Sequence, residues 1–95
     1  EEKHHGLADV RDFWIDENFR RRGLGERLLR LVIEDIKQIF VKDNFTLRKI
    51  IVTTGSNNIP AKSLYEKVGF QEAAAIADLF ALGETELFYV LTLNP

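Results

Sequence analysis

The sequence contains no cysteine, so the chain has neither a disulfide framework nor a thiol nucleophile. Its apolar runs are too short to cross a bilayer, and no signal peptide is visible. We therefore expect a cytoplasmic protein without a membrane partner. Excess positive charge is also lacking. The net charge of −2 argues against nucleic acid as a partner, because phosphate neutralisation needs a broad basic face.

What is present is the composition of one small globular domain. Hydrophobic residues make up 45% of the chain and charged residues 29%, which are ordinary values. A chain of 95 residues forms one domain, so residues 1–95 are assigned to a single unit. Such a chain buries about 60–65% of the surface that its unfolded state exposes, and its core is therefore thin.

A basic loop with two glycines separates a predicted strand from a predicted helix. It comprises Arg20, Arg21, Arg22, Gly23, Leu24, Gly25 and Glu26. Glycines let an anion approach the backbone closely, and the positive end of the helix dipole favours negative charge. The arginines add bidentate donors. The loop therefore predicts a site for a diphosphate or another small anion, with a solvated surface turn as the alternative.

Two common phosphate-binding motifs are excluded for this loop. It lacks the Gly-Lys-Ser/Thr ending of a P-loop, which disfavours hydrolysis of nucleoside triphosphates. It also lacks the three-glycine spacing of dinucleotide-binding folds, and no acidic residue ends a second strand about 20 residues further on. No metal-ligand spacing is present either, so no metal is expected.

Hydrophobic periodicity predicts six elements in the order β-α-β-α-β-β, an α/β domain with helices packed on a mixed sheet. They cover Leu7–Ile15, Gly25–Lys42, Arg48–Thr54, a short helix from Pro60 to Gly69, Phe70–Leu82 and Glu86–Leu93. Asp43-Asn44 is expected to end the long helix, and Asn58 or Ile59 to cap the short one. The apolar stripe of the long helix is predicted at Leu24, Leu28, Leu31, Val32, Ile36, Ile39 and Phe40.

A second motif gives the loop a specific interpretation. It consists of Asn58, Ala61, Leu64, Tyr65, Glu66, Gly69 and Phe70. Together with Arg20, Gly23 and Gly25, it resembles the motifs of the GNAT superfamily of acetyl-CoA-dependent N-acetyltransferases, over about Leu7 to Leu93. The resemblance implies the GNAT-like acyl-CoA N-acyltransferase fold without its N-terminal strands. The chain is then a fragment, one of two chains, or a reduced member of the family.

The resemblance implies transfer of an acetyl group from acetyl-CoA to a primary amine, by direct attack in a ternary complex. The acceptor would be a small molecule or a peptide. The backbone of Phe13, Trp14 and Ile15 would bind the pantetheine arm, and the amides of Arg21 to Glu26 the diphosphate. Asn58 would contact the cofactor arm, with a helix cap as its alternative role.

Tyr65 is the implied general acid. A phenol, with a reference pKa of about 10, can donate a proton or a hydrogen bond to the leaving thiolate. The alternative is a packing residue beside Leu64. Some family members carry a glutamate twelve positions before the tyrosine, where this chain has Thr53, which cannot act as a base at neutral pH. His4 and His5 are weak candidates, so the base stays open between water, another carboxylate and a partner chain.

Two other functions compete with acetyl transfer. The first is a cofactor-binding or regulatory module without turnover, because half of the fold and the glutamate are absent. The second is a structural interaction domain, which would leave the basic loop unexplained. Without preceding strands, the Leu7–Ile15 strand would have an unpaired edge, so we expect a homodimer or another association through that edge.

Overall fold

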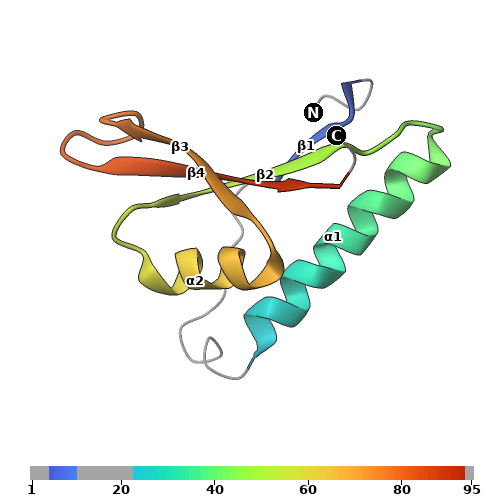
Figure 1. The fold of residues 1–95 in the computed structure, drawn as a ribbon, viewed down its shortest axis with the longest axis horizontal. Coiled ribbons are helices and arrows are strands. Elements are labelled where there is room, and N and C mark those ends of the chain that lie inside the picture. The colour runs from blue at the N-terminus through green and yellow to red at the C-terminus, as the bar shows by residue number, and fades with distance from the viewer. Residues whose placement is uncertain (1–4, 11–22, 94–95) are drawn as a thin grey trace.

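The computed structural model describes residues 5–10 and 23–93 and confirms the predicted order of elements (Figure 1). The elements are β1 (Leu7–Val10), α1 (Leu24–Lys42), β2 (Lys49–Gly55), α2 (Ile59–Val68), β3 (Gln71–Ala77) and β4 (Thr85–Thr92). The predicted first strand extended to Ile15, and its part beyond Val10 lies outside the described residues.

The four strands form one mixed sheet in the order β1-β2-β4-β3. β1 runs parallel to β2, whereas β4 is antiparallel to both β2 and β3. α1 therefore connects the parallel strands β1 and β2, and α2 connects the parallel strands β2 and β3. Both connections move in the same direction across the sheet. Because such connections are right-handed, both helices lie on the same side of the sheet. Figure 1 shows α1 and α2 together below the strands. One face of the sheet is thus covered by helices.

The core lies between the sheet and the two helices. Burial alternates along β2. Ile50, Val52 and Thr54 are buried, whereas the alternate residues Lys49, Ile51 and Thr53 are only half-buried. This period of two shows which face of the sheet the helices cover. The buried hydrophobic residues of the described chain are Ala8, Leu29, Ile33, Phe40, Leu47, Ile50, Val52, Tyr65, Phe70, Leu87 and Tyr89.

The predicted apolar stripe of α1 was wrong for four of its seven residues. Leu24, Leu28, Leu31 and Ile39 are exposed. The buried positions are Gly25, Leu29, Ile33 and Phe40, with Val32 and Ile36 half-buried. Apolar residues occur on more than one side of this helix, and the sheet can cover only one side.

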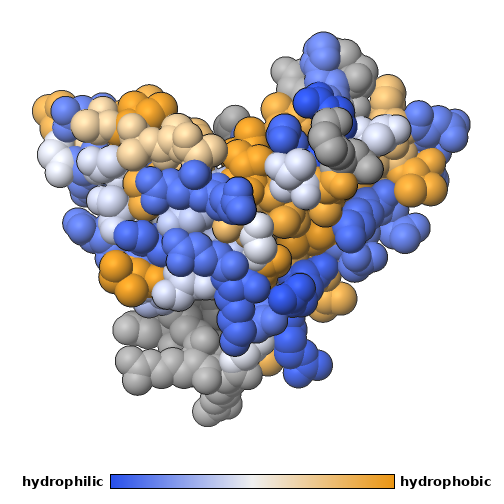
Figure 2. Space-filling model, in the orientation of Figure 1, coloured by the Kyte–Doolittle hydropathy of each residue, from blue (hydrophilic) through white to orange (hydrophobic). Residues whose placement is uncertain are grey.

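The third predicted strand was also too long. β3 ends at Ala77 rather than at Leu82 because Asp78 adopts a left-handed conformation, with φ of 60°. The Asp78 Oδ1 accepts a hydrogen bond from the N–H of Gly83 at 2.6 Å, and this bond closes the turn to β4. Side chains at the tip of this hairpin are apolar and exposed, in the upper left of Figure 2: Ile76, Leu79, Phe80 and Leu82.

The predicted helix ends agree with the structure. Asp43 caps α1, and Asn44 turns the chain with a positive φ of 61°. Asn58 caps α2, and Pro60 lies in its first turn. Gly69 ends α2 in a left-handed conformation, with φ of 114°, and its N–H donates to the carbonyls of Tyr65 and Glu66. Residues with a side chain rarely adopt this backbone conformation, which explains why a glycine occupies this position.

Candidate functional site

The first turn of α1 is open to an anion. Gly23 precedes it in a left-handed conformation, with φ of 73° and ψ of 5°, and no side chain caps the helix. The N–H of Arg27 donates to the Gly23 carbonyl at 3.2 Å. The N–H groups of Leu24, Gly25 and Glu26 therefore precede the first intrahelical bond, and the helix dipole adds positive potential there. This geometry can hold a phosphate.

The carboxylate of Glu26, at the same helix start, is neutralised. Its Oε2 accepts from the Nε of Arg30 at 3.0 Å, and its Oε1 from the Nζ of Lys67 at 3.2 Å. The hydrogen bond from Arg30, followed by that from Lys67, lowers the pKa of Glu26. Because Lys67 lies in α2, this ion pair shows that the start of α1 lies beside the last turns of α2.

Tyr65 lies in those last turns and is nearly buried, with an exposed fraction of 3%. Its ring packs against Phe70 at 5.9 Å and Tyr89 at 5.6 Å between centroids, and both pairs are tilted. Burial raises the pKa of Tyr65, and the negative charge of Glu86 raises it further. The phenol is therefore protonated at neutral pH. Its packing role is confirmed, and its acid role stays a prediction.

Asn58 has a confirmed structural role. Its Oδ1 accepts a hydrogen bond from the N–H of Ala61 at 3.2 Å, so the side chain caps α2. A contact with the cofactor arm stays a prediction. The other predicted site residues lie outside the described part of the chain: Phe13, Trp14, Ile15, Arg20, Arg21 and Arg22.

Glu86 was not among the residues predicted from the sequence. It is half-buried on β4 and pairs with Gly55 of β2 and Ile76 of β3. Its negative charge contributes, after burial, to the raised pKa of Tyr65. One feature of the sequence could have indicated Glu86: it is a single charged residue directly before the apolar run Leu87-Phe88-Tyr89-Val90.

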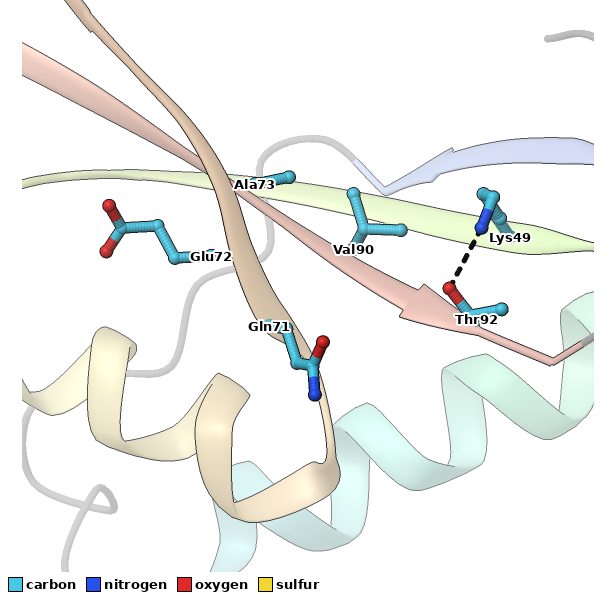
Figure 3. Close-up of a pocket in the computed structure, with 6 residues that line it drawn as sticks. All are labelled: Lys49, Gln71, Glu72, Ala73, Val90 and Thr92. Atoms are coloured by element: carbon cyan, nitrogen blue, oxygen red, sulfur yellow. Dashed lines mark hydrogen bonds between the residues drawn. The ribbon is translucent and has the colours of Figure 1, made fainter. Parts of the chain in front are cut away.

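A separate groove of about 340 Å³ lies at the other end of the sheet (Figure 3). Its lining residues are Lys49, Gln71, Glu72, Ala73, Val90 and Thr92. The Nζ of Lys49 donates to the Oγ1 of Thr92 at 3.0 Å. Lys49 and Thr92 pair at the opposite end of the β2–β4 ladder from Gly55 and Glu86, so this groove is not the predicted site.

Residues 5–10 and 23–93 contain neither a candidate metal centre nor a candidate membrane span. No group of three or more potential metal-ligating side chains lies together there. Neither described helix combines the length and apolar character that crossing a membrane requires.

Comparison with known proteins decides the family. The sequence model of the acetyltransferase (GNAT) domain matches residues 1–72. This chain belongs to the GNAT acetyltransferase family. It is 30% identical over 71 residues to a spermine/spermidine N(1)-acetyltransferase of Bacillus subtilis (strain 168), covering 75% of this chain and 43% of the relative. It is 32% identical over 80 residues to N-alpha-acetyltransferase 30 of Dictyostelium discoideum, covering 84% and 40%.

Solved structures confirm the GNAT-like fold. A GNAT family acetyltransferase from Elizabethkingia anophelis, solved with acetyl-CoA bound, superposes with a TM-score of 0.76 at 20% identity. The match covers 92% of this chain and 61% of that chain. The present chain therefore spans less than half the length of the two curated GNAT relatives and about three fifths of this solved structure.

The open first turn of α1 generates one prediction. Gly23→Val should weaken CoA binding at least tenfold, about 1.4 kcal/mol, because a branched side chain beside the amides obstructs the diphosphate. Because Gly25 is buried, a substitution at that position would test core packing instead of anion binding. Gly83→Val is the matched control, because both glycines have positive φ and neither position has an atom within 4 Å of an added Cβ. Calorimetry that gives both variants the same affinity as the parent would contradict this placement.

The environment of Tyr65 generates another. Tyr65→Phe keeps the ring contacts and removes the hydroxyl, so acetyl-CoA-dependent thiol release should fall about 10²-fold with little change in cofactor affinity. Tyr89→Phe is the control. It removes a buried hydroxyl that donates to Glu66 Oε2 at 3.3 Å, and should cost about 1 kcal/mol of stability without changing turnover. If both variants release thiol at the same rate, Tyr65 has a packing role alone.

Proposed function

We propose that this chain transfers an acetyl group from acetyl-CoA to a primary amine, by direct attack in a ternary complex. The observation that carries the proposal is the position of an anion-ready helix start beside the helix of Tyr65, shown by the 3.2 Å contact between Glu26 and Lys67. A diphosphate on the amides of Leu24 to Glu26 would orient the thioester toward the phenol. Membership of the GNAT family supports the same chemistry.

The neutral amine attacks the carbonyl carbon of the thioester, a C–N bond forms, and the carbonyl oxygen takes up negative charge. As this tetrahedral intermediate collapses, the C–S bond breaks and the nitrogen loses a proton. A thiol has a reference pKa of about 8.5, below the phenol value of about 10. Burial raises the pKa of Tyr65 further, so Tyr65 stabilises the developing thiolate by donating a hydrogen bond. The proton from nitrogen ends on the thiol.

The acceptor is a small-molecule or peptide amine. One curated relative is named for spermine and spermidine, and another as an N-alpha-acetyltransferase. Both names support an amine nucleophile. An attacking amine must be neutral, which is easier for an α-amino group, with a reference pKa of about 7.7–8.0, than for a lysine-like amine at about 10.4.

One observation favours a second candidate, a GNAT module that binds acetyl-CoA without turnover. Thr53 stands where some family members carry a glutamate, so a base is missing at that position. Amine-dependent release of CoA thiol, measured with polyamines, amino acids, aminoglycosides and peptides with free N-termini, separates the two candidates. We expect release that rises with amine concentration. Tight acetyl-CoA binding with no amine-dependent release would favour the binding module.

We also propose a cytoplasmic protein, without membrane or nucleic-acid partners, that associates through the edge of β1. β1 lies at one end of the sheet and pairs only with β2 among the described strands. No second described strand pairs with its other edge, and such an edge can accept another strand. Sedimentation of the 95-residue chain should give a dimer, and a monodisperse monomer would contradict this association.

A further inference from the structure

Glu86 lies where β2 ends, on the sheet face that the described helices do not cover. Its neighbour Leu87 is buried on the helix side, and strand residues alternate, so Glu86 belongs to the opposite face. Its partner across the ladder is Gly55. Among the described residues, no atom lies within 4 Å of a Cβ built on Gly55, so they leave space beside the carboxylate.

The same face carries Thr53, the position at which some family members have a glutamate. Thr53 pairs with Phe88, two residues from Glu86 along β4, and is half-buried like Glu86. Thr53 and Glu86 are therefore diagonal cross-strand neighbours, about 7–8 Å apart between backbones. A glutamate side chain on β4 can reach the space beside Thr53.

The surroundings of Glu86 suit a cation. Residues 70–93, which include β3, β4 and the hairpin between them, contain no lysine or arginine. None of the ion pairs between described residues involves Glu86. An ammonium group in the open space beside Gly55 would thus meet the carboxylate of Glu86.

We propose that Glu86 binds the ammonium group of the acceptor and takes its proton before attack. The role rests on the proposed acetyl transfer. The carboxylate accepts one proton from R–NH3+, which leaves R–NH2 to attack the thioester, and then releases that proton to water. The second proton leaves nitrogen as the C–S bond breaks and ends on the CoA thiol. The base that Thr53 cannot provide is then supplied by the neighbouring strand.

Glu86→Gln tests this role, with Glu84→Gln as the control, because Glu84 is an exposed carboxylate in the same hairpin. For a polyamine acceptor we expect kcat/KM to fall about 10²-fold in Glu86→Gln and less than twofold in Glu84→Gln. The loss should be smaller for a peptide α-amine, whose lower reference pKa leaves more of it neutral. Glu86→Asp, which keeps the charge, should retain part of the activity.

A rescue variant separates a catalytic carboxylate from a structural one. Thr53→Glu in the Glu86→Gln background restores a carboxylate on the same face, and we expect it to recover about tenfold in kcat/KM. Parental activity for both acceptors in Glu86→Gln would overturn the proposal, as would a loss that is equal for both acceptors and not rescued.

Binding measurements keep this inference separate from acetyl transfer itself. Calorimetry of spermidine with the CoA-saturated protein should show at least tenfold weaker binding for Glu86→Gln than for the parent and Glu84→Gln. If the parent gives no amine-dependent thiol release, the proposed function fails and this binding difference alone decides the role of Glu86. Equal binding by all three proteins, or no binding by the parent, would overturn it.

Discussion

The parallel pairing of β1 with β2 and the placement of β3 beyond β4 constrain everything else in this chain. Each arrangement requires a helical connection, and right-handed connections in the same direction place both helices on one face of the sheet. The start of α1 and the last turns of α2 consequently meet, and the ion pair between Glu26 and Lys67 joins them. Ile50 and Val52 of β2 are fully buried in the core between the sheet and the helices.

The sheet separates two kinds of chemistry. On the helix side, the helix start beyond Gly23 offers amides that precede the first intrahelical hydrogen bond, together with positive potential, and both suit a diphosphate. On the other face, at the end of β2, Glu86 offers negative charge beside the open space at Gly55, which suits an ammonium group. Tyr65, buried in the core at this end of the sheet, is influenced by Glu86 and belongs to a helix held against the anion site.

Local signals predicted the fold well, and long-range packing explains most of what they missed. Asn58, Pro60 and Gly69 marked the ends of α2 because caps depend on a few adjacent backbone groups. The buried side of α1 was mispredicted because the helix carries apolar residues on several of its sides. Packing against the sheet determines that Leu29 and Ile33 are the buried ones. Glu86 was missed because its importance comes from pairing with Gly55, 31 residues earlier in the chain.

We propose that the first turn of α1 holds the diphosphate of CoA. Backbone amide chemical shifts of Leu24, Gly25 and Glu26, recorded by NMR during titration with CoA and with pantetheine, test it most directly. Pantetheine lacks the diphosphate, so it serves as the matched control. The account predicts large, saturable shifts of these three amides with CoA and small ones with pantetheine. Unchanged amides in the CoA-saturated protein, or equal shifts with both ligands, would contradict it.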